Sequence, residues 1–200
     1  MTLFDNDEPE ELLSEGGSAV LYRGVIAPGE ADLLVSRLRE ATGWEQPAIH
    51  MYGKSMLQPR LVAWFGDPGV TYSYSGTTHM PIGWTTDLLR LKGECERVSN
   101  AQFNSALANL YRDGNDSVAW HADDEPELGT EPVIASLSLG AERRFHLRHR
   151  ASGQTVRVDL PTGSVLVMSG RCQAEWSHQI SKTKRQVGPR INITFRRVLQ

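Results

Sequence analysis

Apolar residues recur at helical spacing in two segments of the first half of the chain. Residues 31–39 and residues 87–98 each repeat apolar positions three to four apart. Such spacing places the apolar side chains on one side of an α-helix, so both segments predict amphipathic helices. The stretch between them, residues 44–83, is rich in Gly, Pro and aromatic residues and predicts loops and short hairpins.

From residue 101 onward the pattern changes to short segments bounded by turn residues. In residues 144–150, for example, Phe145, Leu147 and His149 alternate with polar side chains, as in a half-buried strand. The predicted strands are 106–112, 133–139, 144–150, 155–160, 164–168 and 190–198. Strands at this spacing predict a mainly β fold with flanking helices (α+β), built around a sandwich or jelly-roll core.

The length and composition predict one domain after a short tail. Residues 1–17 are acidic and nearly lack aromatic side chains, so we expect a mobile tail. Residues 18–200 are enough for a single domain, in which 18–100 is the mixed region and 101–200 the β core. Two cysteines provide no disulfide framework, and no signal peptide or membrane-length apolar run occurs. We therefore expect a monomeric, intracellular, cytoplasmic protein.

The net charge of −3 conceals a strong asymmetry along the chain. Residues 141–200 contain 12 Lys and Arg against 3 Asp and Glu, so the other 140 residues are strongly acidic. A basic C-terminal third can form a local face that attracts anions. The alternative is an ordinary solvated sheet surface, which charge alone does not exclude.

One short motif has the residue types and spacing of a metal site. His121 and Asp123 are two residues apart, so on a strand both side chains would face the same interior point. With His178 they would form the two-histidine, one-carboxylate set that binds non-haem Fe(II) and leaves positions open for a cosubstrate and O₂. An isolated His-x-Asp is common by chance, and structural zinc is a weaker alternative because it takes four ligands.

A second group of polar residues lies on predicted strands near this motif. Asn109 and Tyr111 would share one strand face, and Arg190, Asn192 and Arg196 would share another. Buried Arg and Asn side chains are costly unless they are paired, and Arg binds carboxylates bidentately. A solvated face is the alternative. Together with an iron site, the pattern predicts a cradle for the carboxylates of an organic acid.

These residues together resemble the AlkB family. The strings are Asn109-Leu-Tyr111-Arg-Asp-Gly-Asn-Asp-Ser-Val-Ala-Trp-His121-Ala-Asp123-Asp124-Glu125, the distal His178, and Arg190-Ile-Asn192-Ile-Thr-Phe-Arg196. The family consists of Fe(II)/2-oxoglutarate dioxygenases that remove alkyl lesions from nucleic-acid bases. The resemblance runs from Pro47 to the C-terminus. Gln58-Pro59-Arg60 and residues 66–76 are similar to the eukaryotic-type DNA-repair branch.

The resemblance implies a double-stranded β-helix (jelly-roll) core over 101–200, preceded by nucleotide-recognition hairpins. It implies that His121, Asp123 and His178 ligate Fe(II). It further implies that Arg190, with Asn109 and Tyr111, holds the distal carboxylate of 2-oxoglutarate. Arg196 and Asn192 would then hold the end that chelates the metal, with O₂ as the second cosubstrate.

The resemblance also assigns residues to the nucleic-acid substrate. Tyr72 and Tyr74 would line a pocket for a flipped base, with core packing as the alternative. Asp124 and Glu125 could favour a cationic alkylated base, or could serve only as turn and cap residues. Tyr52 would fill the gap that the flipped base leaves in a duplex. Phosphate contacts are expected from Arg143, Arg144, Arg148, Arg150 and the loop 182–185. The remaining substrate positions are Arg60 and Ser75.

The expected activity is oxidative demethylation of 1-methyladenine and 3-methylcytosine in DNA, with release of formaldehyde and succinate. The partner would be alkylated nucleic acid, DNA favoured over RNA, with no membrane association. A second hypothesis is a 2-oxoglutarate oxygenase acting on RNA, protein or a small molecule. A third is a jelly-roll module that binds metal without catalysis, against which the intact Arg190 and Arg196 argue.

Overall fold

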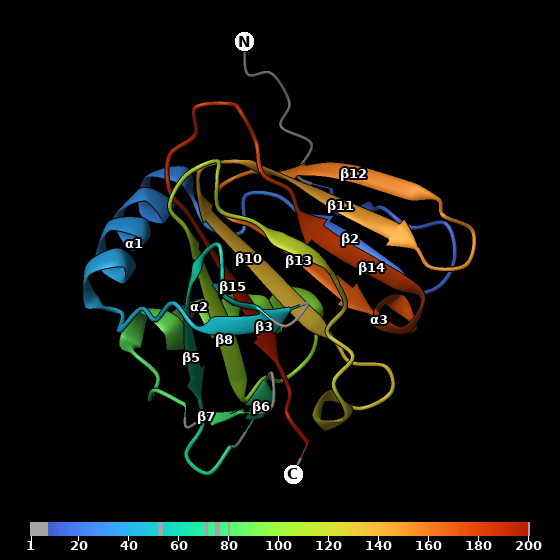
Figure 1. Ribbon diagram of the computed structural model, residues 1–200. Coiled ribbons are helices and arrows are strands. Elements are labelled where there is room, and N and C mark those ends of the chain that lie inside the picture. The colour runs from blue at the N-terminus through green and yellow to red at the C-terminus, as the bar shows by residue number, and fades with distance from the viewer. Residues whose placement is uncertain (1–7, 52–53, 71, 75–76, 80, 200) are drawn as a thin grey trace.

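Two antiparallel sheets and two long helices make up the protein. The computed structural model describes residues 8–51, 54–70, 72–74, 77–79 and 81–199; for 49–51, 54, 72–74 and 77–79 only the backbone is considered. The large sheet has the order β1-β2-β13-β10-β15-β8-β5, and the small sheet has the order β12-β11-β14-β9. Figure 1 shows the small sheet lying over one end of the large sheet.

The large sheet consists of β1 (Glu10–Glu11), β2 (Ser18–Tyr22), β5 (Leu61–Gly66), β8 (Ser105–Tyr111), β10 (Ile134–Gly140), β13 (Ser164–Ser169) and β15 (Arg190–Arg196). The small sheet consists of β9 (Val118–His121), β11 (Arg143–His149), β12 (Thr155–Leu160) and β14 (Trp176–Ile180). Two hairpins stand apart from both sheets: β3 (Ala48–Met51) with β4 (Lys54–Leu57), and β6 (Tyr72–Tyr74) with β7 (Thr77–His79).

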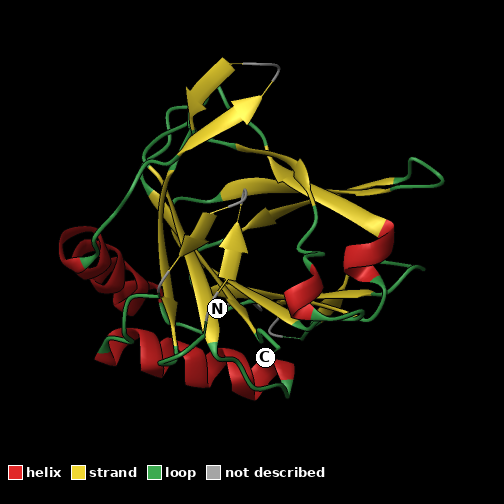
Figure 2. Ribbon diagram, turned by 60° about the horizontal axis from the view of Figure 1, so that its bottom comes forward, coloured by secondary structure: helices red, strands yellow, loops and turns green. Residues whose placement is uncertain are grey.

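The two long helices cover the outer face of the large sheet (Figure 2). In α1 (Pro28–Ala41), the buried residues Ala31, Leu34, Val35 and Leu38 recur at helical spacing. In α2 (Thr86–Ser99), the Thr85 side chain accepts a hydrogen bond from the Leu88 amide and caps the first turn. Two short helical turns, α3 (Cys172–Glu175) and η1 (Pro126–Leu128), lie in the connections.

Apolar side chains form two cores, one on each side of the large sheet. One lies between this sheet and the helices and includes Leu34, Leu91 and Phe195. The other lies between the two sheets and includes Leu147 and Trp176. The large sheet is therefore buried on both faces, and in β10, β13 and β15 nearly every residue is buried, polar ones included.

The architecture confirms the predicted fold class, a mainly β protein with flanking helices and two antiparallel sheets. Both predicted helices and all six predicted strands form. The strands β2, β5 and β14 were not predicted. β5 is a short apolar run inside a segment rich in Gly, Pro and aromatic residues, so it does not alternate. In β14 three polar residues separate Trp176 from Ile180, so periodicity gave a weak signal.

The prediction of a mobile tail through residue 17 is wrong for its second half. Glu10 and Glu11 pair with β2, and Leu13 is buried in the core between the sheets. The Glu11 carboxylate accepts hydrogen bonds from the amides of Leu13 and Ala19. The acidic composition led to a wrong prediction here, because the Glu11 carboxylate does not remain in solvent but accepts hydrogen bonds from backbone amides and so stabilises a short edge strand.

Strand register brings polar residues together inside the fold. Asn109 of β8 lies opposite Asn192 of β15, and Tyr111 lies opposite Arg190. On β15 the polar residues alternate with Ile191, Ile193 and Phe195, which pack under the helices. A single strand therefore contributes to the helix-covered core with one face and to the space between the sheets with the other.

In the part of the chain that the structure describes, no helix is both long enough and apolar enough to span a bilayer.

The turn between β12 and β13 requires a glycine at position 163, and a substitution there tests how closely this turn packs against the chain at Ile26. Gly163 has φ +75°, and a Cβ there would lie 1.9 Å from the Ile26 carbonyl oxygen. We predict that Gly163→Ala lowers the free energy of unfolding by about 2–4 kcal/mol, combining left-handed strain with overpacking. Urea denaturation measures the change.

Gly153→Ala is the matched control for this substitution. Gly153 has φ +74°, but nothing lies within 4 Å of a Cβ built there. This variant should show only the backbone strain, about 1 kcal/mol. Equal losses in the two variants would show that the close approach of Gly163 to Ile26 does not limit the fold.

Candidate metal and carboxylate site

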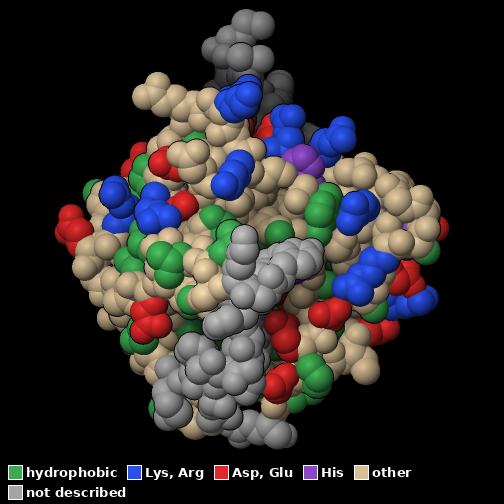
Figure 3. Space-filling view, in the orientation of Figure 1, with side chains coloured by type: hydrophobic (Ala, Val, Ile, Leu, Met, Phe, Trp, Pro, Cys, Tyr) green, Lys and Arg blue, Asp and Glu red, His purple; other side chains and the backbone are tan. Residues whose placement is uncertain are grey.

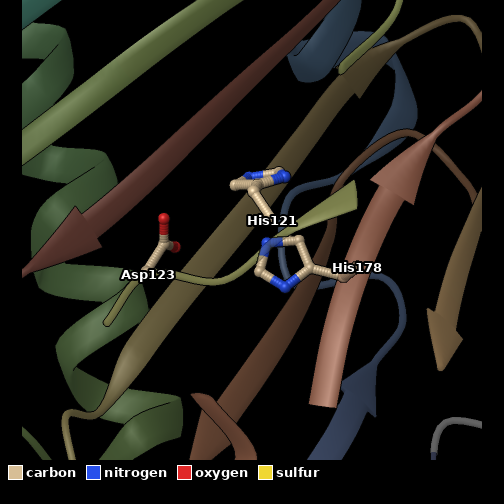
Figure 4. Close-up of side chains that lie close together, drawn as sticks. All are labelled: His121, Asp123 and His178. Atoms are coloured by element: carbon tan, nitrogen blue, oxygen red, sulfur yellow. The ribbon is translucent and has the colours of Figure 1, made fainter. Parts of the chain in front are cut away.

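His121, Asp123 and His178 converge between the two sheets (Figure 4). One potential ligand atom from each of them lies within 4.8 Å of the others, the one such group found among the described residues. His121 of β9 is the register partner of His178 of β14, and their ring centroids are 4.3 Å apart. Asp123 follows β9 by two residues. The structure thus assembles the three predicted ligands.

Hydrogen bonding leaves one nitrogen of His121 ready to bind a metal. Its Nδ1 lies 2.8 Å from the carbonyl oxygen of Ala119. A carbonyl oxygen only accepts, so Nδ1 carries the proton and Nε2 keeps its lone pair. His121 is therefore held in one tautomer and one orientation by the strand that carries it.

His178 is buried and neutral. Its ring stacks on Phe145, with centroids 5.2 Å apart. Burial, together with the nearby His121, lowers the pKa of His178 to about 3. An imidazole with such a low pKa is unprotonated at neutral pH and can coordinate a cation without first losing a proton.

The third ligand is a buried carboxylate held from two sides. Arg196 Nη2 donates to Asp123 Oδ1 at 2.8 Å, and the Asp123 amide donates to Gln173 Oε1 at 2.9 Å. Burial alone would raise the pKa of Asp123, but the positive charge of Arg196 lowers it overall. Asp123 is therefore an ionised ligand that is already oriented.

Two imidazoles and one carboxylate fit Fe(II) better than a structural zinc ion. Three protein ligands on one side of a metal leave positions open, which is the arrangement of non-haem iron oxygenases. A structural zinc site would need a fourth protein ligand. Among the described residues, no fourth His, Cys, Asp or Glu joins the group.

A cavity of about 110 Å³ adjoins the three ligands. All the residues predicted to bind the metal or the cosubstrate line this cavity, and so do Arg60 and Glu125. Its polar and charged lining consists of Arg60, Asn109, Tyr111, His121, Asp123, Glu125, Ser136, His178, Arg190, Asn192, Thr194 and Arg196. Its apolar lining consists of Leu107, Val118, Ala122, Phe145, Met168 and Ile180.

Arg190 provides unused donors at the far end of this cavity. Its Nη2 donates to Ser138 Oγ at 2.9 Å, while Nε and Nη1 are buried without a hydrogen-bond partner among the described atoms. Burial lowers the pKa of Arg190 to about 10, so it remains a cation at neutral pH. Buried guanidinium donors are costly to leave unpaired, so the site fits a bound carboxylate.

The two asparagines have different hydrogen-bond roles. Asn109 Oδ1 accepts from Arg60 Nε at 2.7 Å, which leaves the Asn109 NH₂ group available to the cavity. Asn192 Nδ2 donates to Ser136 Oγ and to the Leu137 carbonyl oxygen, at 2.8 and 2.9 Å. Asn192 therefore braces β15 against β10, and its donors are already used.

Arg143 is buried, and the prediction that it contacts phosphate is wrong. Its guanidinium donates to the carbonyl oxygens of Asp113, Asp116 and Ser181. It also lies 5.6 Å from the Tyr111 ring centroid, and Arg190 lies 5.2 Å from the same centroid. Arg143 thus holds Tyr111 in place and ties two loops to the edge of the cavity.

The two acidic residues after Asp123 point in different directions. Asp124 is exposed and pairs with Arg150 at 2.9 Å. Glu125 lines the cavity, and its Oε2 is buried without a hydrogen-bond partner among the described atoms. Of the two carboxylates, Glu125 is the one that faces the site.

The aromatic positions predicted for the base are only partly described. Tyr72 and Tyr74 lie in β6, opposite His79 and Thr77, in a hairpin of which the structure describes the backbone alone. Tyr52 and Ser75 lie outside the described residues.

Sequence reasoning missed several residues that hold the site. Ser136 and Ser138 stand on the inward face of β10 and bind Asn192 and Arg190. Two serines at alternate positions of an otherwise apolar strand were an available signal. Gln173, which supports Asp123 from α3, lies in a segment with no pattern that predicts its role.

Comparisons with known proteins agree with this geometry. Residues 18–196 match the 2OG-Fe(II) oxygenase superfamily. Alpha-ketoglutarate-dependent dioxygenase alkB homolog 3 of Mus musculus is 40% identical over 188 residues, which cover 89% of this chain and 65% of the relative. The chain therefore spans just under two thirds of that relative's length. DNA oxidative demethylase ALKBH2 of Homo sapiens is 35% identical over 189 residues, which cover 89% of this chain and 72% of the relative.

The fold also matches a solved structure. The structure of OsALKBH1 superposes with a TM-score of 0.69, covering 94% of this chain and 100% of that chain, at 16% sequence identity. At this identity the likeness concerns the fold alone.

The metal site can be tested with one substitution and a control on the same sheet. We predict that His121→Ala weakens Fe(II) binding at least about a hundredfold, because loss of a ligand exceeds the usual effect of losing its supporting groups. Anaerobic calorimetric titration measures the affinity. His146→Ala, on the outer face of the same sheet and outside the cavity, should bind Fe(II) as the wild type does. Equal affinities in both variants would disprove the ligand assignment.

Proposed function

The chain belongs to the 2OG-Fe(II) oxygenase superfamily and, within it, to the AlkB homologues, and on this premise we propose that it demethylates nucleic-acid bases. The substrates would be 1-methyladenine and 3-methylcytosine in DNA, and the products formaldehyde and succinate. Several relatives are named DNA oxidative demethylases, which supports DNA over RNA. The activity would be a direct reversal of alkylation damage.

The observation that carries the proposal is a triad and a carboxylate cradle in one cavity. His121, Asp123 and His178 would hold the iron, and Arg190 lies in the same cavity with buried donors unused. A protein that only stored a metal would not need a buried cation beside it. Bound Fe(II), with 2-oxoglutarate and O₂, would supply the oxidising power for hydroxylation of an N-methyl carbon.

The residues of this chain would position the cosubstrate. Arg190 would receive the distal carboxylate of 2-oxoglutarate, with Tyr111 beside it and the NH₂ group of Asn109 as a further donor. Arg196 would attract the end near the metal while it keeps Asp123 ionised and oriented. Asn192 would act by bracing β15.

Other residues, on the cavity wall and on the hairpin β6–β7, would recognise an alkylated base. Methylation at a Watson–Crick nitrogen fixes a positive charge on adenine or cytosine, and Glu125 offers a carboxylate on the cavity wall. Flipping such a base costs on the order of a few kcal/mol, least for a poorly paired one. Tyr72 and Tyr74 on β6 would supply aromatic rings on which the base stacks. Arg60 would connect the segment between β4 and β5 to Asn109. Tyr52, Ser75 and Asp124 are further proposed contacts to the substrate.

Apolar side chains would keep water away from the reacting atoms. Phe145 stacks on His178, and Val118 and Ile180 complete that wall of the cavity. A dry site strengthens the attraction between fixed charges and prevents side reactions. These three apolar residues belong to the small sheet, whereas Arg190 and Arg196 project into the cavity from β15 of the large sheet.

We further propose that residues 10–200 form one dioxygenase domain that acts as a monomer in the cytoplasm. All the proposed ligands come from a single chain. Cys95 and Cys172 are buried free thiols, as expected of a protein in a reducing compartment.

The function is tested by incubating the protein with Fe(II), 2-oxoglutarate, ascorbate and methylated oligonucleotides. We predict loss of one methyl mass from 1-methyladenine and 3-methylcytosine, with succinate formed in equal amount. Mass spectrometry of the oligonucleotides decides the result, and matched DNA and RNA strands compare the two nucleic acids. Succinate without loss of methyl from any strand would favour an oxygenase of another substrate class.

The carboxylate cradle has its own test. Replacing Arg190 with Met should raise the KM for 2-oxoglutarate about tenfold to a hundredfold, the range expected for losing a charged hydrogen-bond pair. Arg144→Met is the control, because Arg144 is exposed and pairs with Asp159 outside the cavity. Steady-state succinate formation measures both variants. An unchanged KM for Arg190→Met would refute the assignment.

A further inference from the structure

The outer face of the small sheet carries a tryptophan stacked with an arginine. The Arg148 guanidinium lies 4.4 Å from the centroid of the Trp120 ring. The edge of the same ring meets His146, with centroids 6.4 Å apart at 89°. Arg148 and His146 come from β11 and Trp120 from β9, so the group spans the strand β14 that lies between them.

A bulge turns Trp120 outward, away from the cavity. Strand pairing joins His178 to His121 and Ile180 to Val118, with a register shift between the two pairs. Gln179 of β14 therefore lies opposite two residues of β9, Ala119 and Trp120, and His121 and Val118 both line the cavity. Trp120, which lies between them in sequence, stands against the outward side chains of β11 instead.

This face also carries more cations than carboxylates. Among the described residues, Arg148 and Arg157 have no ion-pair partner, whereas Arg144 pairs with Asp159. Arg157 is the register partner of His146 on β12. The adjoining loop adds Lys182, Lys184 and Arg185, which likewise have no ion pair within the described chain. Figure 3 shows Lys and Arg side chains, with a His among them, over this loop and the neighbouring small sheet.

We propose that the strand of nucleic acid flanking the methylated base docks on this face, with a base stacked on the Trp120–Arg148 pair. The proposal rests on the proposed function and names a surface for its substrate outside the active-site cavity. We call the group Trp120, His146, Arg148 and Arg157 the outer platform.

Position and chemistry both favour this occupant. Trp120 directly precedes the ligand His121, and adjacent Cα atoms lie about 3.8 Å apart, so the platform begins beside the cavity. Planar aromatic and guanidinium groups stack on unpaired bases, and neighbouring cations attract phosphates. The uncompensated charge stands out on a chain whose net charge is −3, so a polyanion is the complementary partner.

The platform is tested by comparing substrates of two lengths. One is a trinucleotide with a central 1-methyladenine, and the other is a single strand of about fifteen nucleotides, long enough to cover an extended site. Activity on the trinucleotide reports on the catalytic centre, so the readout is the ratio of kcat/KM for the long and short substrates. We expect Arg148→Gln and Trp120→Leu each to lower this ratio about five- to tenfold.

Binding of an undamaged strand gives an independent readout. Fluorescence anisotropy at several salt concentrations yields the slope of log K against log salt. For a single strand this slope changes by about 0.7 for each phosphate that the protein no longer neutralises. Arg148→Gln should lower the slope by about this amount. Arg148→Lys keeps the charge but not the planar guanidinium group. This variant should therefore keep the wild-type salt slope but bind the undamaged strand more weakly than the wild type.

Arg39→Gln is the matched control for removing a cation. Arg39 is exposed on α1, which covers the other side of the large sheet. It should keep the wild-type length ratio and salt slope. If the Arg148 and Trp120 variants behave like this control, the face is solvated or serves another partner, and the platform is refuted. Absence of demethylation by the wild type on either substrate would instead refute the proposed function, and the binding data would still judge the platform.

Discussion

The ion pair between Asp123 and Arg196 is the interaction on which the interior of this protein depends. Both side chains are almost fully buried, and their atoms lie 2.8 Å apart. Neither charge is stable alone in such surroundings, since breaking a buried pair costs about 3–5 kcal/mol. The pair fixes a carboxylate beside two neutral imidazoles and keeps it ionised. It thus allows three ligands to coexist between two packed sheets.

The strand β15 extends the same constraint along the sheet. Its polar residues meet partners on β10 and β8, and its apolar residues pack beneath the helices. A shift of one residue would exchange these faces and bury the arginines among Leu and Phe side chains. The register that forms the helix-covered core is therefore the register that forms the site. Stability and chemistry are specified by one set of strand pairings.

Much of this could be predicted from local pattern. Alternation and helical spacing predicted both helices and six strands. Strand geometry suggested the pair His121 and Asp123, although Asp123 lies two residues beyond the end of β9. The failures have physical causes. Arg143 looked like a surface cation because nothing in its neighbourhood shows that three carbonyl oxygens converge on it. The outward turn of Trp120 depends on a bulge, which requires knowledge of the partner strand. Asp124 and Glu125 differ only through contacts distant in sequence.

The pairing of Asp123 with Arg196 also affects the stability of the protein in its metal-free state. In many small metal sites the ion is the counter-charge that allows the ligands to be buried, so its loss unfolds the protein. Here a fixed guanidinium supplies the counter-charge, and both histidines are uncharged or bonded to backbone. Chelation should therefore give an inactive but intact apoprotein that is restored by adding iron. The folded structure therefore does not require the metal, and the metal can leave and return without unfolding the protein.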